Sequence, residues 1–234
     1  MYYKLNRPAL KAEARRIIRE GRPSVLKAGG IFFLMQAVLF GLLMWNTWRG
    51  AYFVDGVLYF AESTPVQMFL DIFLNLLTLL LGAGFTLFLM ELRRGLEPPY
   101  AAMFDSFSIM GRVIWLQINV SVRVFLWSLL FTIPGIVATY RYRFALYNLL
   151  ENPELSASQA IALSKVQTYG MKMELFVCDL SFVGWNIVSL FTLALLNIWL
   201  TPYMVLTDLE YYEAGKARVS PHPGGQPPRQ DLPW

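Results

Sequence analysis

The sequence has very few of the side chains that build catalytic centres and disulfide frameworks. Its 234 residues include one cysteine, Cys178, and one histidine, His222. A lone cysteine cannot form a disulfide within the chain, and we expect a small buried side chain there. The sequence also lacks the H-E-x-x-H, C-x-x-C, G-x-S-x-G and phosphate-loop motifs. These absences predict a protein that is not an enzyme and that holds no metal ion and no cofactor.

Charged residues are scarce as well, and the apolar residues come in long runs. Asp, Glu, Lys and Arg make up 15% of the chain, whereas a soluble domain carries roughly a quarter. The run 24–48 holds Lys27 as its one charged residue, and the run 66–90 holds only Asp71. About 20 apolar residues, at a rise of about 1.5 Å each, cross the hydrocarbon core of a bilayer. The sequence therefore predicts an integral membrane protein.

The apolar runs predict an all-α fold, a transmembrane bundle of about six helices in three hairpins over residues 24–213. The expected spans are 24–48, 66–90, about 112–133, about 136–150, about 171–194 and about 198–212. Pro134 and Gly135 should end the third span, because proline disfavours helix in the residue before it and glycine permits a tight reversal. Gly82 and Gly84 give the second span a thin face, which we expect to pack within the chain rather than in a dimer. Pro202 lies within the sixth span, so a full crossing there requires that the helix tolerates it.

The first 23 residues form a separate amphipathic unit. Leu10, Ala14, Ile17 and Ile18 share one helical face. Six basic residues occupy the rest of the surface: Arg7, Lys11, Arg15, Arg16, Arg19 and Arg22. Such a helix lies in the membrane interface, where each basic residue near anionic lipid contributes about 1 kcal/mol. We therefore expect the net charge of +4 to serve binding to the anionic inner leaflet and not to nucleic acid, or to act only as a topology signal.

The distribution of the other basic residues predicts the orientation of the chain. With the N-terminus inside, nearly all Lys and Arg outside the spans lie on cytoplasmic segments, and Arg49 is the exception. Because short cytoplasmic loops carry an excess of Lys and Arg, we expect both termini in the cytoplasm.

Two cytoplasmic segments have recognisable local signals. The loop after the fourth span should carry a helix over 156–169, because Ser156 and Gln159 form a capping-box pattern. Gly170 suits the end of that helix. The tail, residues 214–234, is rich in proline and glycine and should be disordered.

The second half of the chain carries four motifs in order. They are W-S-L-L-F-T-I-P-G-I at 127–136, E-N-P-E-L-S-A-S-Q-A-I-A-L-S at 151–164, F-V-C-D-L-S-F-V-G-W at 176–185 and T-P-Y-M at 201–204. In these motifs the chain resembles a family of bacterial integral membrane proteins catalogued as domain of unknown function 975. The resemblance implies a multi-pass protein of the bacterial cytoplasmic membrane without an assigned activity. The family pattern has small or hydroxyl residues near 139–146, where this chain has Arg141 and Arg143, so the resemblance gives these arginines no role.

Four charged residues inside the predicted spans form the candidate binding site: Arg123, Arg141, Arg143 and Asp179. An unpaired charge in hydrocarbon is costly, so we expect Asp179 to pair with Arg143 or with Arg123. One arginine would then be left for an anionic group. Three interpretations remain open. The charges join helices, a surplus arginine lines a cavity for a phosphate- or carboxylate-bearing molecule, or Arg141 and Arg143 reach lipid phosphates at the interface.

These observations favour a non-catalytic scaffold or accessory subunit. It would work through membrane lipids, a partner protein or a second copy of the chain. The alternative is a small carrier or channel that uses the buried arginines to bind an anionic or amphiphilic molecule. A ligand ordered beside Arg123, Arg141 or Arg143 would favour the carrier.

Overall fold

The structure is a computed structural model that describes residues 6–60 and 62–219. Its elements, in chain order, are α1 (Arg7–Glu20), α2 (Val25–Trp48), β1 (Ala51–Val54), β2 (Val57–Phe60), α3 (Pro65–Arg93), η1 (Tyr100–Ile109), α4 (Met110–Leu130), α5 (Thr132–Tyr142), α6 (Ala145–Glu151), α7 (Ala157–Gln167), α8 (Lys172–Phe191) and α9 (Asn197–Val219). The predicted tail begins later than expected, because α9 continues to Val219. Its last turn is held by Arg218, whose Nη1 donates to the Tyr169 carbonyl at 3.2 Å. Residues 220–234 of that tail lie outside the described part.

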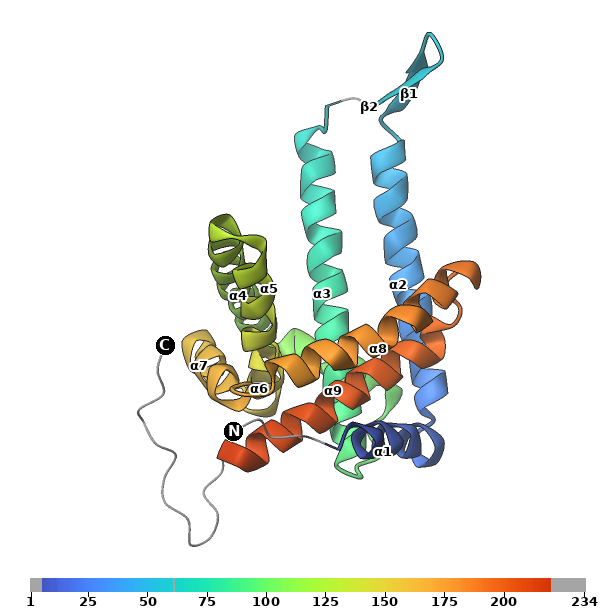
Figure 1. Cartoon of the computed structure of the whole chain (residues 1–234). Coiled ribbons are helices and arrows are strands. Elements are labelled where there is room, and N and C mark those ends of the chain that lie inside the picture. The colour runs from blue at the N-terminus through green and yellow to red at the C-terminus, as the bar shows by residue number, and fades with distance from the viewer. Residues whose placement is uncertain (1–5, 61, 220–234) are drawn as a thin grey trace, which may run out of the picture.

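Helices α2 and α3 run side by side as the tallest part of the molecule (Figure 1). Strands β1 and β2 join them as an antiparallel hairpin where the sequence predicts a loop, so the fold is not purely α-helical. The hairpin forms because Asp55 and Gly56 take positive φ angles of 51° and 78°, as a two-residue turn requires. Across the strands the rings of Tyr52 and Tyr59 stack with their centroids 5.8 Å apart.

Four segments of the described structure are long and apolar enough to cross a membrane. They are Val25–Trp48, Pro65–Arg93, Tyr100–Leu130 and Lys172–Phe191. Large apolar side chains along them are exposed, such as Leu34 and Phe125. Long apolar helices with outward-facing apolar surface indicate a membrane protein.

The predicted arrangement of six spans is not confirmed. The fourth predicted span is divided into α5 and α6, which have 11 and 7 residues. At about 1.5 Å per residue neither helix crosses about 30 Å of hydrocarbon. The division has a cause outside the local sequence: the amide of Phe144, between the two helices, donates to Ser164 Oγ of α7 at 3.1 Å.

The reversal between α4 and α5 lies at Phe131, a few residues before the predicted position. Phe131 is extended, with φ −162° and ψ 153°. Pro134 follows in the first turn of α5, where a missing amide hydrogen costs little. Gly135 serves a close approach instead of a turn, because a Cβ there would lie 2.1 Å from Ser128 Oγ on α4.

The core lies where α9 packs against the second half of α3. Leu206 and Tyr211 of α9 and Phe88 of α3 are fully buried. The predicted sixth span is therefore part of a helix that packs largely against protein. Gly84 of α3 lets η1 approach closely, since a Cβ there would lie 1.7 Å from the Met103 carbonyl oxygen. This is the predicted packing within the chain at Gly84, whereas a Cβ at Gly82 would have no neighbour within 4 Å.

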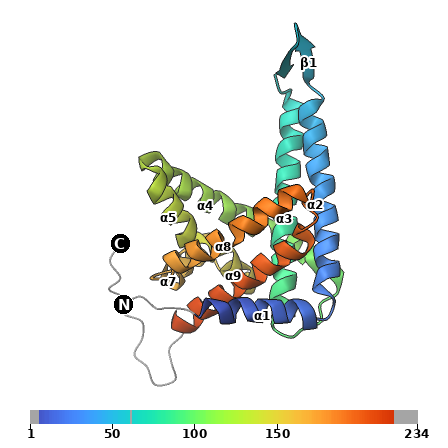
Figure 2. The ribbon, with the colours of Figure 1, turned by 45° about the vertical axis from the view of Figure 1, so that its right-hand side comes forward.

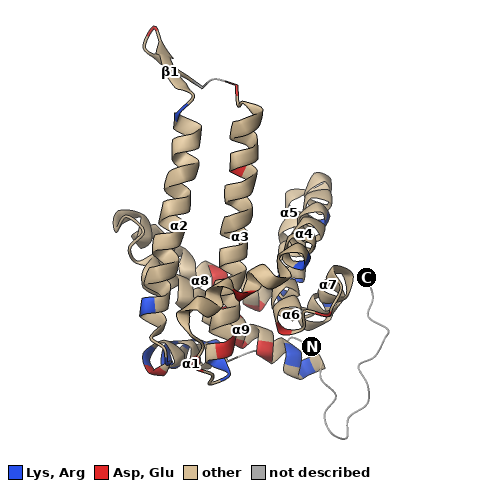
Figure 3. Ribbon diagram, turned by 180° about the vertical axis from the view of Figure 1, so that it is seen from behind, with Lys and Arg blue, Asp and Glu red and all other residues tan. Residues whose placement is uncertain are grey.

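Helix α1 lies across the lower end of the molecule, against α9 and below the tall hairpin (Figure 2). Its first turn is capped by Asn6, whose side chain accepts from the Ala9 amide at 3.3 Å. Ala14 and Ile18 of α1 are buried against the rest of the protein. Most charged residues of the described structure gather at this lower end, and the tall hairpin is almost free of them (Figure 3).

Candidate functional site

Arg143 lies between two carboxylates at the junction of α5 and α6. Its Nη1 and Nη2 atoms lie 2.6 and 2.8 Å from the carboxylate oxygens of Asp179 on α8. Its Nη2 and Nε atoms lie 2.8 and 3.1 Å from the carboxylate of Asp208 on α9. The predicted pair of Arg143 with Asp179 is therefore present, and the alternative partner Arg123 does not take part.

Two tyrosines complete this group, the Arg143 cluster, which consists of Tyr140, Arg143, Tyr147, Asp179 and Asp208. The Tyr140 hydroxyl donates to Asp179 at 2.9 Å, and the Tyr147 hydroxyl lies 3.5 Å from Asp208. Carboxylates shielded from water need such donors. The cluster connects α5, α6, α8 and α9, so its direct effect is to hold these helices together. The sequence did not identify Asp208 as a partner, because its position near the inner end of the sixth predicted span placed it closer to solvent.

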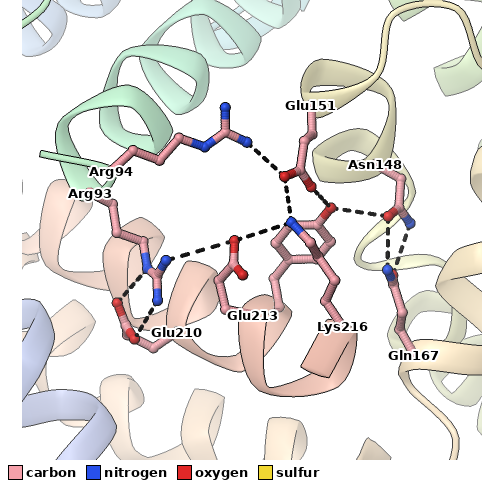
Figure 4. Close-up of polar contacts among 9 residues, drawn as sticks. Arg93, Arg94, Asn148, Glu151, Gln167, Glu210, Glu213 and Lys216 are labelled. Carbon is pink, nitrogen blue, oxygen red and sulfur yellow. Dashed lines mark hydrogen bonds and ion pairs between the residues drawn. The ribbon is translucent and has the colours of Figure 1, made fainter. Parts of the chain in front are cut away.

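A second charged group connects the end of α3 with α6 and α9 (Figure 4). This Glu151 network consists of Arg93, Arg94, Glu151, Glu210, Tyr212, Glu213 and Lys216. Arg94 Nη2 lies 2.7 Å from Glu151 Oε1, and Lys216 binds the same carboxylate. Arg93 contacts both oxygens of Glu210, at 2.7 and 3.0 Å. Three cations face three carboxylates, so the network is formally neutral.

The environment of Glu151 keeps its carboxyl ionised. Burial opposes ionisation, yet hydrogen bonds from Lys216 and Tyr212 hold the pKa of Glu151 below its ordinary value of 4.5. The Tyr212 hydroxyl lies 2.5 Å from Glu151 Oε2. Next to the network, Asn148 and Gln167 exchange two hydrogen bonds of 2.9 Å (Figure 4). Hydrogen bonds and ion pairs between α3, α6, α7 and α9 thus hold the lower end of the bundle.

Arg123 and Arg141 belong to neither group. Helices α4 and α5 run antiparallel from the reversal at Phe131, with Ser128 opposite Gly135. Along both helices, counted from that contact and away from the reversal, Arg123 and Arg141 lie at similar distances. The two residues are therefore at the same level. Both lie towards the base of the α4–α5 hairpin. The sequence placed Arg141 within the bilayer because it treated 136–150 as one continuous span, and it placed Arg123 within the third span, about 112–133.

Helix α7 brings a lysine to the same place. The carbonyl oxygen of Arg141 accepts hydrogen bonds from Ser164 Oγ at 3.0 Å and Thr168 Oγ1 at 3.2 Å. Lys165 follows Ser164 directly. Its partial burial and the positive charges of Arg141 and Arg123 lower the pKa of the Lys165 amino group.

Lys172 completes what we name the basic cluster: Arg123, Arg141, Lys165 and Lys172. Lys172 is the first residue of α8, and its charge interacts with that of Arg141. No side chain of the cluster forms an ion pair or a hydrogen bond with a described residue. The sequence left one arginine for an anion, whereas the structure leaves two together with two lysines. The capping box that begins α7 predicted the helix that carries Lys165, but it gave no signal for the contact of this helix with α5.

The basic residues of α1 divide into two rows. Arg7 pairs with Glu174, Lys11 contacts Ser181 and lies over the Phe182 ring, and Arg15 donates to the Tyr203 hydroxyl at 3.0 Å. This row of the predicted lipid-binding residues therefore faces α8 and α9. The other row is exposed at the surface: Arg16, Arg19 and Arg22.

Two pockets lie away from the basic cluster. An apolar pocket of about 460 Å³ opens between α2 and the start of α9, beside Phe33 and Asn197. A polar pocket of about 310 Å³ lies between α1 and the end of α3, beside Arg16 and Glu97. Neither touches Arg141, so neither is the cavity expected for an arginine-lined carrier. Within residues 6–60 and 62–219, no three or more His, Cys, Asp or Glu side chains are arranged to hold a metal ion.

Comparison with known protein families gives a match over most of the chain. A family model described as "Protein of unknown function (DUF975)" matches residues 60–219. The matched region runs from α3 to α9 and includes the Arg143 cluster, the Glu151 network and the basic cluster. No curated protein and no solved structure matches the chain.

Proposed function

We propose that this chain, which belongs to the DUF975 family, is a non-catalytic scaffold or accessory subunit of the bacterial cytoplasmic membrane. The observation that carries the proposal is the use of its inner charges. In the Arg143 cluster and the Glu151 network, the ionised side chains bond to oppositely charged side chains of neighbouring helices. Buried pairs of this kind fix helix positions. A bundle held in this way presents a defined surface to lipids or to a partner protein.

The distribution of charge supports an orientation with both termini in the cytoplasm. The exposed row Arg16, Arg19 and Arg22 lies at the lower end of the molecule, and α9 also ends there (Figures 1 and 3). Arg49 follows α2 at the opposite end. Because basic residues favour the cytoplasmic side, the lower end faces the inner leaflet.

The path of the chain supports three hairpins that open towards this inner face. Their turns are the β1–β2 hairpin, the reversal at Phe131 and the loop between α8 and α9, all at the upper ends of the helices they join (Figure 1). The first hairpin crosses the bilayer fully. The other two enter from the inner face and pack against it, since α5 is short and α9 is largely covered by protein.

Photo-cross-linking in the intact membrane tests the proposal. A photoreactive residue at Phe40, which is exposed on α2, should give one dominant product of defined mass, a partner or a second copy. The same residue at Phe85, which is buried, is the matched control and should give none. If Phe40 and other exposed positions on α2 give only lipid adducts, the protein has no partner there and the accessory role fails.

The second candidate is a carrier for a small anion, which the unpaired basic cluster favours. Vesicles that contain the protein and entrapped inorganic phosphate distinguish the two. The scaffold proposal predicts that phosphate leaves no faster than from protein-free vesicles. Faster release that Arg141→Gln abolishes would establish the carrier instead.

A further inference from the structure

The basic cluster has a structural basis in four different helices. Arg123 comes from α4, Arg141 from α5, Lys165 from α7 and Lys172 from α8. Its frame is rigid where these helices meet: the Arg141 carbonyl is bound by two hydroxyls of α7. Met171, directly before Lys172, is fully buried. Packing between helices therefore fixes the backbone beside Arg141, Lys165 and Lys172.

The chain does not neutralise this cluster. Asp179 of α8 and Asp208 of α9 are both bound to Arg143, and Glu210 and Glu213 of α9 pair with Arg93 and Lys216. Glu174, nearer to Lys172 along α8, pairs with Arg7. Like charges held together raise the free energy of the folded state unless an anion offsets them. Every described acid beside the cluster is thus already used.

Apolar side chains border the cluster on the same helical faces. Leu126, Val137 and Phe176 lie one turn from Arg123, Arg141 and Lys172, at i+3, i−4 and i+4. They are 54%, 42% and 41% exposed, which is the behaviour of side chains that face lipid. The cluster therefore lies at the edge of an apolar surface, at the level where α7 closes the inner end of the bundle. Head-group phosphates occupy this level of a bilayer.

We propose that Arg123, Arg141, Lys165 and Lys172 bind one phosphate group at the inner membrane face. Arginine offers paired N–H donors that match two phosphate oxygens, and lysine adds point charge. The phosphate belongs to an anionic lipid head group or to a soluble phosphate, because both present the same oxygens. This inference deepens the proposed function by naming a ligand. A protein that binds no phosphate could still act through a partner protein, so the two proposals fail separately.

The experiment compares two triple variants of the full chain in nanodiscs and in micelles. Arg123→Gln/Arg141→Gln/Lys165→Gln removes three charges from the cluster. Arg16→Gln/Arg19→Gln/Arg22→Gln removes the same charge from the exposed row of α1. One arm adds phosphatidylglycerol to phosphatidylcholine discs and counts retained lipid by native mass spectrometry. The other arm adds inorganic phosphate to the protein in dodecyl maltoside micelles, which contain no phosphate, and measures binding by ³¹P NMR.

We expect the cluster variant to bind its ligand at least about tenfold more weakly than the wild type, and the α1 variant to bind as the wild type does. Weaker lipid retention assigns the site to a head group, and weaker binding of inorganic phosphate alone assigns it to a soluble ligand. Equal binding by both variants and the wild type in both arms overturns the proposal.

The proposal stays testable even if the cluster variant does not fold. The wild type alone gives a second measurement, its thermal unfolding midpoint in the same discs and micelles. Binding to the folded state must raise that midpoint. A midpoint that neither phosphatidylglycerol nor inorganic phosphate raises overturns the proposal without any variant.

Lys165→Gln/Lys172→Gln, which keeps both arginines, should give an intermediate loss of binding.

Discussion

The paired charges and the basic cluster lie in the same inner part of the molecule but differ in what completes them. The Glu151 network sets three cations against three carboxylates, and in the Arg143 cluster one guanidinium serves two carboxylates. The basic cluster holds four cations and bonds to no described acid. The first kind of group is complete within the chain and stabilises the fold. The second is complete only when an anion comes from outside.

The largest difference in stability is expected between loss of Arg143, which is paired, and loss of Arg141, which is not. Arg143→Met leaves Asp179 and Asp208 without their shared cation, so we expect the free energy of unfolding to fall by about 3–5 kcal/mol. Denaturant unfolding in detergent micelles, followed by helix content, measures this. Arg141→Met is the control, and it should lower the free energy of unfolding by less than about 1 kcal/mol.

Removing the carboxylates as well should recover stability. Arg143→Met combined with Asp179→Asn and Asp208→Asn should unfold closer to the wild type than Arg143→Met alone, because no buried charge is left unpaired. Arg143→Asp combined with Asp179→Arg should not recover it, since the new carboxylate would face Asp208. If Arg143→Met unfolds like the wild type, the Arg143 cluster does not hold the helices together.

A smaller loss is expected from Glu151→Gln. The Glu151 carboxylate, 15% exposed, accepts bonds from Arg94, Lys216 and Tyr212. Hydrogen bonds to charged groups contribute about 1.5–3 kcal/mol, so the free energy of unfolding should fall by about that much. Glu154→Gln is the matched control: its side chain is 94% exposed, and its 3.7 Å pair with Arg112 should contribute less than about 0.5 kcal/mol. Equal effects of the two substitutions would contradict the structural role of the network.

The same residue gives a pH dependence with a definite sign. The pKa of Glu151 is lowered in the folded protein, so its contribution is complete above the unfolded value near 4.5 and is lost as the pH falls through the folded value. The difference in free energy of unfolding between the wild type and Glu151→Gln should therefore be largest at neutral pH and shrink below pH 4.5. Unfolding curves of both proteins at neutral and acidic pH measure it. A difference that grows on acidification would reverse the assigned sign.

Local signals in the sequence predict local structure well here. The capping box of Ser156 and Gln159 begins α7, and the small residue Gly84 marks a close approach within the chain. The capping box depends on residues that are neighbours along one helix, and the close approach at Gly84 depends on a small residue that admits η1. The pair of Arg143 with Asp179 was also predictable, because two opposite charges at similar depth have few other partners.

Partners far apart in the sequence were not predictable. Asp208 lies 65 residues from Arg143, and its position depends on how α9 packs against α3. The break between α5 and α6 depends on a hydroxyl of α7, whereas hydropathy alone predicts one continuous helix. The same break moves Arg141 from mid-span to the base of its hairpin, beside Lys165. The basic cluster therefore follows from tertiary packing, and the apolar runs carry no signal for it.

The smallest expected effect compares the same Lys→Gln substitution in the Glu151 network and in the basic cluster. The free energy of unfolding should fall in the first case and should not fall in the second. Lys216→Gln removes a cation that binds Glu151, so it should lower the free energy of unfolding by about 1 kcal/mol. Lys165→Gln removes a cation that only repels its neighbours, so in phosphate-free maltoside micelles it should leave that free energy unchanged or raise it by about 0.2–0.5 kcal/mol. Added salt should then stabilise the wild type more than Lys165→Gln, since it screens the repulsion. If Lys165→Gln is as destabilising as Lys216→Gln in these micelles, Lys165 has a partner within the chain and the cluster needs no anion.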